Sequence, residues 1–203
     1  VSLSSARGTD VRRPAIFTPE TADAMQMPVG PDTFDAVLFD MDGVLTTTAR
    51  MHATAWKRTF DEFLEAWDRE HGSETHRFSI AEDYPSTVDG KAREDGVRDF
   101  LASRHIDLPL GSPDSPPDEW SVHGIGKRKQ AYVEEALERE GVEVFPGSVA
   151  WLRELRDLGL QTAVVTSSRN CKAILDAAGI FDLFDAVVDG NTAAELGLAG
   201  KPA

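Results

Sequence analysis

The chain has 203 residues, of which 41% are hydrophobic and 28% charged, a composition typical of one globular domain or a core with a small insert. Its formal charge of −14, from 21 basic and 35 acidic residues, argues against a nucleic-acid partner, because phosphate backbones require a clustered excess of Lys and Arg. No segment approaches the roughly 18 apolar residues of a membrane span, and the first residues lack a secretory pattern, so we expect a cytoplasmic protein without a membrane partner.

The first part of the chain changes from an irregular tail to a strand. Residues 1–33 are rich in Pro, Thr, Asp and Arg without sustained periodicity, which predicts a flexible N-terminal tail. Residues 36–39 form a short apolar run between Asp35 and Asp40, which predicts a strand buried on both faces. We therefore place the start of the folded core at residue 34.

Helical patterns dominate the middle of the chain. Apolar residues recur at helical spacing over residues 51–67, and further helices are predicted over residues 93–104 and 127–140. Between the last two helices, residues 108–120 contain four prolines, which exclude regular structure and mark a loop. The pattern predicts an all-helical insert over residues 51–140.

Strands and helices alternate again after residue 141. A helix is predicted over residues 148–158, a strand over 162–165, a helix over 170–179 and a strand over 186–190. Alternating strands and helices are typical of a parallel sheet with right-handed crossovers. The sequence thus predicts an α/β core, discontinuous in the chain and formed by residues 34–50 and 141–203.

Polar side chains follow two of the predicted strands, where ligands bind in open parallel sheets. Asp40 and Asp42 come directly after the first strand, and Thr166 and Ser167 come after the second. Two carboxylates about 4 Å apart repel by roughly 4 kcal/mol at an effective dielectric constant near 20. Mg²⁺ removes this penalty, and an aspartate can also accept a phosphoryl group. The arrangement predicts Mg²⁺-dependent phosphoryl transfer, with Asp40 and Asp42 at the metal.

Short motifs in the core and in the insert resemble those of one enzyme superfamily. The segments FDMDGVL (39–45), VVTSSRN (164–170) and GKPA (200–203) are similar, in this order, to the first three motifs of the haloacid dehalogenase (HAD) superfamily. The segments HATAWK (52–57), VDGKAREDGV (88–97) and GKRKQ (126–130) resemble the β-phosphoglucomutase-like branch. The resemblance covers residues 34–203 and implies a HAD-like Rossmannoid parallel sheet with an inserted helical cap.

This resemblance also implies a role for individual residues. Asp40 would be the nucleophile that becomes phosphorylated, and Asp42 would be the general acid and base. Both would lie at the Mg²⁺ site, where Asp42 also presents its backbone carbonyl. The transferring and distal phosphates of a sugar phosphate would be bound by Thr166, Ser167, Ser168, Asn170 and Lys201 from the core, and by His52, Arg93 and Lys129 from the cap.

The implied reaction converts β-glucose 1-phosphate to glucose 6-phosphate through phosphorylated Asp40 and a bisphosphate intermediate. A sugar-phosphate phosphatase would use the same core residues, with water in place of a sugar hydroxyl. Two departures from the resemblance bear on the sugar rather than on the phosphoryl chemistry. Thr47 stands where relatives often carry an aspartate, and Asp89 stands where β-phosphoglucomutase tends to carry a basic residue.

The fourth motif of the superfamily, an acidic pair on the next strand that completes the Mg²⁺ site, has no counterpart before the chain stops at Ala203. We therefore expect a truncated form of a longer protein, with a core that is incomplete at its C-terminus. An inactive remnant is the third interpretation that the sequence leaves open.

Overall fold

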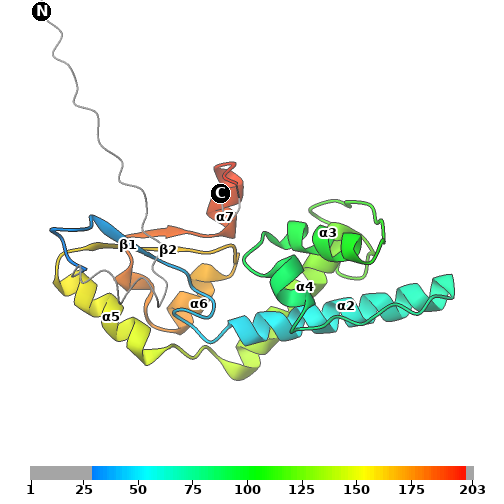
Figure 1. Ribbon diagram of the computed structural model, residues 1–203, viewed down its shortest axis with the longest axis horizontal. Helices are drawn as coiled ribbons and strands as arrows, with labels where there is room; N and C mark the ends of the chain where they lie inside the picture. The colour runs from blue at the N-terminus through cyan, green and yellow to red at the C-terminus, as the bar shows by residue number, and fades with distance from the viewer. Residues whose placement is uncertain (1–28, 200–203) are drawn as a thin grey trace, which may run out of the picture.

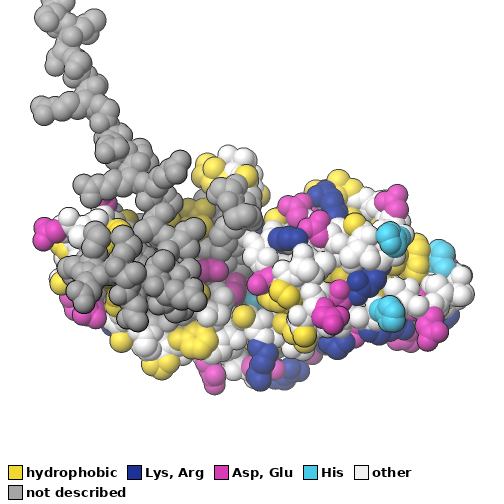
Figure 2. All heavy atoms as spheres, in the orientation of Figure 1, with side chains coloured by type: hydrophobic (Ala, Val, Ile, Leu, Met, Phe, Trp, Pro, Cys, Tyr) yellow, Lys and Arg dark blue, Asp and Glu magenta, His cyan; other side chains and the backbone are white. Residues whose placement is uncertain are grey.

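The structure, a computed structural model, describes residues 29–199, which form two lobes (Figure 1). Each lobe has its own hydrophobic core, and the visible face of the helical lobe carries both basic and acidic side chains (Figure 2). One lobe contains a parallel sheet and the other is helical. Most of the predicted N-terminal tail and Lys201 lie outside the described residues. The domain limits at residues 34, 51 and 141 stay predictions, which the two separate cores support. Among the helices between residues 29 and 199, none is long and apolar enough to cross a membrane.

The sheet has three parallel strands in the order β1 (Ala36–Phe39), β2 (Gln161–Val165) and β3 (Ala186–Val188). Helices α5 (Pro146–Asp157) and α6 (Cys171–Ala177) contribute buried side chains to the same core, which confirms the predicted α/β architecture. The predicted third strand extends too far. It ends at Val188 because the Asp189 side chain accepts hydrogen bonds from two backbone amides of α7 (Gly190–Glu195).

Strand β1 is less buried than its sequence predicts. Within residues 29–199 it pairs with β2 alone, so it lies at an edge of the sheet. Val37 and Phe39 face the core, whereas Leu38 is 65% exposed on the opposite face. The prediction of a strand buried on both faces is therefore wrong for the described chain, because successive side chains of a strand point to opposite faces and the core covers one of them.

The helical lobe contains α2 (Ala49–His71), the short π-helix η1 (Tyr84–Val88), α3 (Arg93–Ser103) and α4 (Val122–Glu140). Its core is aromatic: the Phe60 ring lies 3.9 Å from the centroid of Phe100 and 5.0 Å from that of Trp56. Helix α4 begins earlier than predicted, because Ser121 caps it by accepting a hydrogen bond from the Gly124 backbone amide. The 3₁₀-helix η2 (Phe181–Leu183) belongs to the other lobe.

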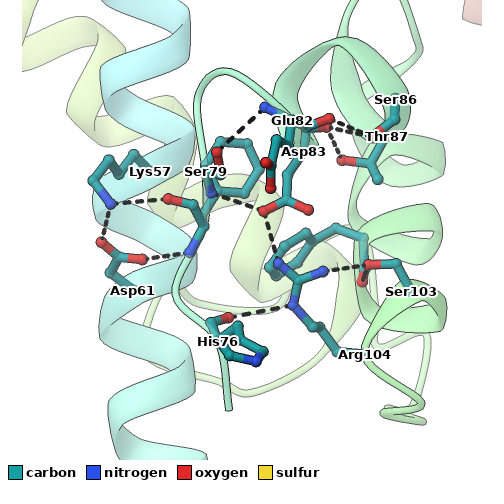
Figure 3. A network of polar contacts seen from close by, with 12 residues as sticks. Lys57, Asp61, His76, Ser79, Glu82, Asp83, Ser86, Thr87, Ser103 and Arg104 are labelled. Atoms are coloured by element: carbon teal, nitrogen blue, oxygen red, sulfur yellow. Dashed lines mark hydrogen bonds and ion pairs between the residues drawn. The ribbon is translucent and has the colours of Figure 1, made fainter.

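A polar network holds the segment before η1 against α2 and α3 (Figure 3). The Asp61 carboxylate accepts from the Phe78 backbone amide at 2.8 Å. The Asp83 carboxylate accepts from the Ser79 backbone amide and from the Arg104 guanidinium, both at 2.7 Å. Because η1 begins directly after Asp83, this network fixes the position of the residues that η1 presents to the sheet lobe.

The two chain crossings between the lobes lie side by side. The Phe145 backbone amide donates to the Leu45 carbonyl at 2.9 Å, and the Thr47 amide donates to the Glu143 carbonyl at 3.0 Å. Thr46 and Val144 form an antiparallel bridge between these two bonds. The lobes are thus joined by one short two-stranded connection, which places α2 and the first strand at opposite ends of it.

Candidate active site

A pocket lies between the two lobes and is lined by residues of both. Every sequence-predicted site residue that the structure describes lines it: Asp40, Asp42, His52, Arg93, Lys129, Thr166, Ser167, Ser168 and Asn170. The remaining predicted residue, Lys201, lies outside the described residues. Segments more than 100 positions apart in the chain therefore meet here, as the resemblance implied.

The two aspartates follow β1 in a tight turn. The Leu45 and Thr46 backbone amides both donate to the Met41 carbonyl, which folds the chain back directly after Asp42. Gly43 adopts a φ of +80°, a conformation that side chains other than glycine rarely take. The turn brings the carboxylates of Asp40 and Asp42 to the same end of the sheet.

Asp42 is held by hydroxyl groups from two segments. The Thr48 hydroxyl donates to Oδ1, and the Thr166 hydroxyl, which follows β2, donates to Oδ2 at 3.5 Å. Burial raises the pKa of Asp42, and the neighbouring Asp40 adds to this, while the Thr48 hydrogen bond and Lys129 oppose it. This carboxyl group is therefore oriented by two hydroxyl groups, and its environment favours the protonated form more than water does.

A lysine and a histidine of the helical cap lobe extend the polar contacts of Asp42 into the cap. The Lys129 Nζ atom lies 2.7 Å from His52 Nδ1, and His52 Nε2 lies 3.5 Å from Asp42 Oδ1. Burial lowers the pKa of His52 well below its usual value, and Lys129 lowers it further. Burial, followed by the charge of Arg93, lowers the pKa of Lys129 to about 7. When Nδ1 accepts from Lys129, the ring proton lies on Nε2 and faces the carboxylate of Asp42.

A second set of contacts joins the cap to the loop after β2. The Arg93 guanidinium donates to the Gln130 Oε1 atom at 2.7 Å, and Gln130 donates in turn to Asn170. The aliphatic part of Arg93 lies across Gly126 of α4, where a Cβ atom would be 3.0 Å from Arg93 Cδ. A small residue at position 126 therefore lets Arg93 reach the pocket.

The lobes also contact each other directly beside the pocket. The Ser167 hydroxyl donates to the Gly90 carbonyl at 2.7 Å. The Arg169 guanidinium forms an ion pair with the Glu94 carboxylate at 3.2 Å. These contacts connect the loop after β2 with the segment between η1 and α3.

Sequence reasoning missed several residues that line the pocket. Gln130 and Arg169 stand inside the motifs that carried the resemblance, so their position was available although no role was assigned. Trp56 likewise stands inside such a motif, HATAWK (52–57), and was given no role. Tyr84 stands before a proline in a stretch without periodicity, and no local pattern marks it as a site residue.

The pocket offers a metal ion oxygen ligands from two aspartates. Between residues 29 and 199, His, Cys, Asp and Glu side chains do not gather in groups of three or more that could hold an ion. Mg²⁺ is usually held by one or two carboxylates, with waters and substrate phosphate oxygens completing its octahedron. The donor set of Asp40 and Asp42 fits this requirement.

A family model described as haloacid dehalogenase-like hydrolase matches residues 34–203. The chain is 44% identical over 173 residues to a β-phosphoglucomutase of Mycobacterium bovis, covering 85% of this chain and 66% of that protein. It is 27% identical to a β-phosphoglucomutase of Bacillus subtilis, covering 82% of this chain and 64% of the relative. The chain thus spans slightly less than two thirds of the length of these relatives.

Solved structures share the fold at low sequence identity. A β-phosphoglucomutase from Clostridium difficile superposes with a TM-score of 0.58 at 18% identity, covering 81% of this chain and 72% of that one. CbbY from Rhodobacter sphaeroides, in complex with phosphate, superposes with a TM-score of 0.54 at 23% identity, covering 77% of this chain and 64% of that one.

Proposed function

The chain belongs to the haloacid dehalogenase-like hydrolase family, and on this premise we propose that it transfers the phosphoryl group of a sugar phosphate through a phosphorylated Asp40. One observation carries the proposal: the carboxylates of Asp40 and Asp42 share a pocket with Arg93 and Lys129 of the cap. Carboxylates provide a nucleophile and a proton carrier, and the cations provide charge for a phosphate, so a phosphate ester matches both sides of this pocket.

We propose Mg²⁺ as the cofactor, held by the Asp40 carboxylate and the Asp42 backbone carbonyl. When bound, Mg²⁺ would neutralise charge on the aspartates and on the phosphoryl oxygens.

In the first half of the reaction, a carboxylate oxygen of Asp40 attacks phosphorus. The bond between phosphorus and the ester oxygen breaks, and that oxygen takes a proton from Asp42. The hydroxyls of Thr48 and Thr166 orient Asp42 for this transfer. The Thr166 hydroxyl also accepts from the Ser168 backbone amide at 3.1 Å, which fixes it at the end of β2.

In the second half, a hydroxyl group attacks the phosphorus of the phosphorylated Asp40. Asp42 accepts the proton of this hydroxyl, and the bond between phosphorus and the Asp40 oxygen breaks, which restores the Asp40 carboxylate and the protonated Asp42. We propose the 6-hydroxyl group of β-glucose 1-phosphate as the acceptor, which gives glucose 1,6-bisphosphate. This bisphosphate then gives its 1-phosphoryl group to Asp40, as in the first half, and leaves as glucose 6-phosphate. The 44% identity to a β-phosphoglucomutase supports this choice. Arg93 and Asn170 would hold the distal phosphate.

A sugar-phosphate phosphatase is the second candidate, and the description of the matching family as hydrolases favours it. Water would then attack the phosphorylated Asp40 and release inorganic phosphate. The two candidates differ in whether the closed cap excludes water from the pocket.

The experiment follows both products from one substrate. The protein is incubated with Mg²⁺, β-glucose 1-phosphate and a trace of glucose 1,6-bisphosphate, and ³¹P NMR quantifies glucose 6-phosphate and inorganic phosphate. Intact-mass measurement detects the phosphorylated chain. Asp40→Asn should lower turnover by about 10⁴-fold or more. Asp35→Asn, an exposed aspartate just before β1, is the matched control and should not change it.

Glucose 6-phosphate as the main product supports the mutase, and inorganic phosphate supports the phosphatase. Absence of both turnover and phosphorylation in the wild-type chain would overturn the proposal and favour the inactive remnant.

A further inference from the structure

Gln130 of α4 lies at the centre of a polar cluster between the cap and the loop after β2. Its Oε1 atom accepts from the Arg93 guanidinium at 2.7 Å and from the Asn170 side-chain amide at 3.2 Å. Its Nε2 atom donates to the Asn170 Oδ1 atom and, at 2.7 Å, to the Glu134 carboxylate. One side-chain amide therefore bonds to an arginine and a glutamate of the cap and to an asparagine of the core.

The direction of these bonds follows from the chemistry of the partners. A guanidinium only donates and a carboxylate only accepts, so Oε1 has to face Arg93 and Nε2 has to face Glu134. The Asn170 amide then pairs with Gln130 through two complementary hydrogen bonds. The donors of Arg93 and Asn170 thus converge on a single oxygen atom.

The acceptor on which these donors converge carries no charge. Burial lowers the pKa of Arg93 and the charge of Arg169 lowers it further, while Glu94 and Glu134 compensate only in part. Both of these carboxylates also have other partners, since Glu94 pairs with Arg169 at 3.2 Å and Glu134 accepts from Gln130. An anion in the place of the Gln130 oxygen atom would therefore supply negative charge that the amide does not supply.

From this geometry we propose that Gln130 is a placeholder for a phosphate group: in the free protein its amide oxygen lies between Arg93 and Asn170, where a phosphate oxygen of the ligand replaces it. The inference rests on the proposed function, which gives Arg93 and Asn170 the distal phosphate of a sugar phosphate. Gln130 then competes with the ligand for these two donors, and its effect on affinity is opposite in sign to that of a residue that holds the ligand.

A neutral amide suits this role better than a carboxylate or an apolar side chain. Hydrogen bonds between charged partners are about twice as strong as neutral ones, so a phosphate displaces an amide from Arg93. A carboxylate at position 130 would pair with Arg93 and repel the ligand. An apolar side chain would leave the donors of Arg93 and Asn170 without a partner in the free protein.

The same exchange concerns the contact between the lobes. Gln130 lies in the cap and Asn170 in the core, so their two hydrogen bonds tie the lobes together in the free protein. A phosphate held by Arg93 and Asn170 would connect the same lobes through its own oxygen atoms. The lobes thus stay joined at this point when the ligand replaces the amide.

Removal of the amide should strengthen binding. All proteins carry Asp40→Asn to prevent turnover, and calorimetry in Mg²⁺ gives the affinity for glucose 1,6-bisphosphate, whose two phosphate groups fill both phosphate sites. Gln130→Met should bind it about fivefold tighter, because donors without a partner raise the free energy of the ligand-free protein. Gln130→Ala removes the same amide and should give a gain of the same sign. Gln161→Met replaces an exposed glutamine at the start of β2 and is the matched control.

A second measurement shows whether the gain comes from the donors. In an Arg93→Met background, Gln130→Met should bring a gain of about twofold or less, because the competition for the guanidinium no longer exists. An equal gain in both backgrounds would mean that the substitution merely loosens the cap, and would overturn the placeholder. Weaker or unchanged binding by Gln130→Met with Arg93 intact would do the same, as would a parent protein that binds neither glucose 1,6-bisphosphate nor inorganic phosphate.

Failure of the proposed function is distinguishable from failure of the placeholder. The proposed function fails when Asp40 of the wild type is never phosphorylated, even though Gln130→Met binds the bisphosphate more tightly than its parent. The placeholder fails alone when Asp40 is phosphorylated and the gain in affinity is absent.

Discussion

Replacing Lys129 by methionine should change the pH dependence of stability in a direction that the structure fixes. Lys129 is 6% exposed, and its pKa falls from 10.5 to about 7 through burial and the charge of Arg93. Between these two values the unfolded chain binds a proton that the folded chain does not bind. The free energy of unfolding therefore rises with pH in this window, by up to about 1.4 kcal/mol per pH unit.

The magnitude follows from the width of the window. Between pH 7.5 and 9.5 the wild type should gain about 2 kcal/mol of stability relative to Lys129→Met, because the variant has no group to titrate at this position. Below pH 7 Lys129 is protonated in both the folded and the unfolded wild-type chain. The difference in the free energy of unfolding between the wild type and Lys129→Met should therefore level off there at its lowest value. Groups such as Cys171, whose pKa burial raises to about 12, are present in both proteins and cancel in the difference.

Urea unfolding followed by tryptophan fluorescence provides the assay. Trp56 is a suitable reporter because its ring lies 5.2 Å from the Lys129 Nζ atom. The titration is run on both proteins at half-unit steps from pH 6.5 to 9.5. A wild-type minus variant difference that stays flat over this range would refute the reasoning, since it would mean that Lys129 keeps its proton in the folded protein.

Two further substitutions test the positions of Arg93 and of the η1 segment. Gly126→Ala should weaken sugar-phosphate binding about tenfold because the added Cβ displaces Arg93, although alanine favours the helix. Gly147→Ala, where the added Cβ meets open space, is the control. Equal binding of the sugar phosphate by the two variants would contradict the prediction. Arg104→Met should lower the free energy of unfolding by about 3 kcal/mol because it leaves the largely buried Asp83 carboxylate without its cation. Chemical denaturation measures this loss, and a change below the error of the method would show that water replaces the guanidinium.

The alternation of elements and the position of each strand along the chain could be predicted from the sequence, although the third strand ends two residues earlier than predicted. Each depends on local signals: an apolar run before Asp40, helical spacing around Phe60, and a glycine where α5 gives way to β2. The pocket residues that stand within family motifs, such as Arg93 and Thr166, were predicted from the resemblance of those motifs, and both line the pocket.

Contacts that depend on tertiary packing could not be predicted. The exposure of Leu38 depends on what covers the sheet, which no run of apolar residues specifies. The start of α4 was placed at residue 127, five residues late, because the cap by Ser121 and the burial of Ile125, which stabilise the first turn, depend on the folded structure. The place of Tyr84 in the pocket follows from Asp83 and its distant partner Arg104, a relation between segments that local patterns do not contain.

The contacts between Ser167 and Gly90 and between Arg169 and Glu94 have a kinetic consequence. They join the lobes beside the pocket, so we expect a ligand to enter mainly while they are broken. The association rate constant then equals that of the open form multiplied by the fraction of molecules that are open. Salt screens the ion pair and raises this fraction, but it also weakens the attraction between a phosphate and the cations inside. Because the two effects oppose each other, association should slow less steeply with ionic strength than it does for a permanently accessible cationic site.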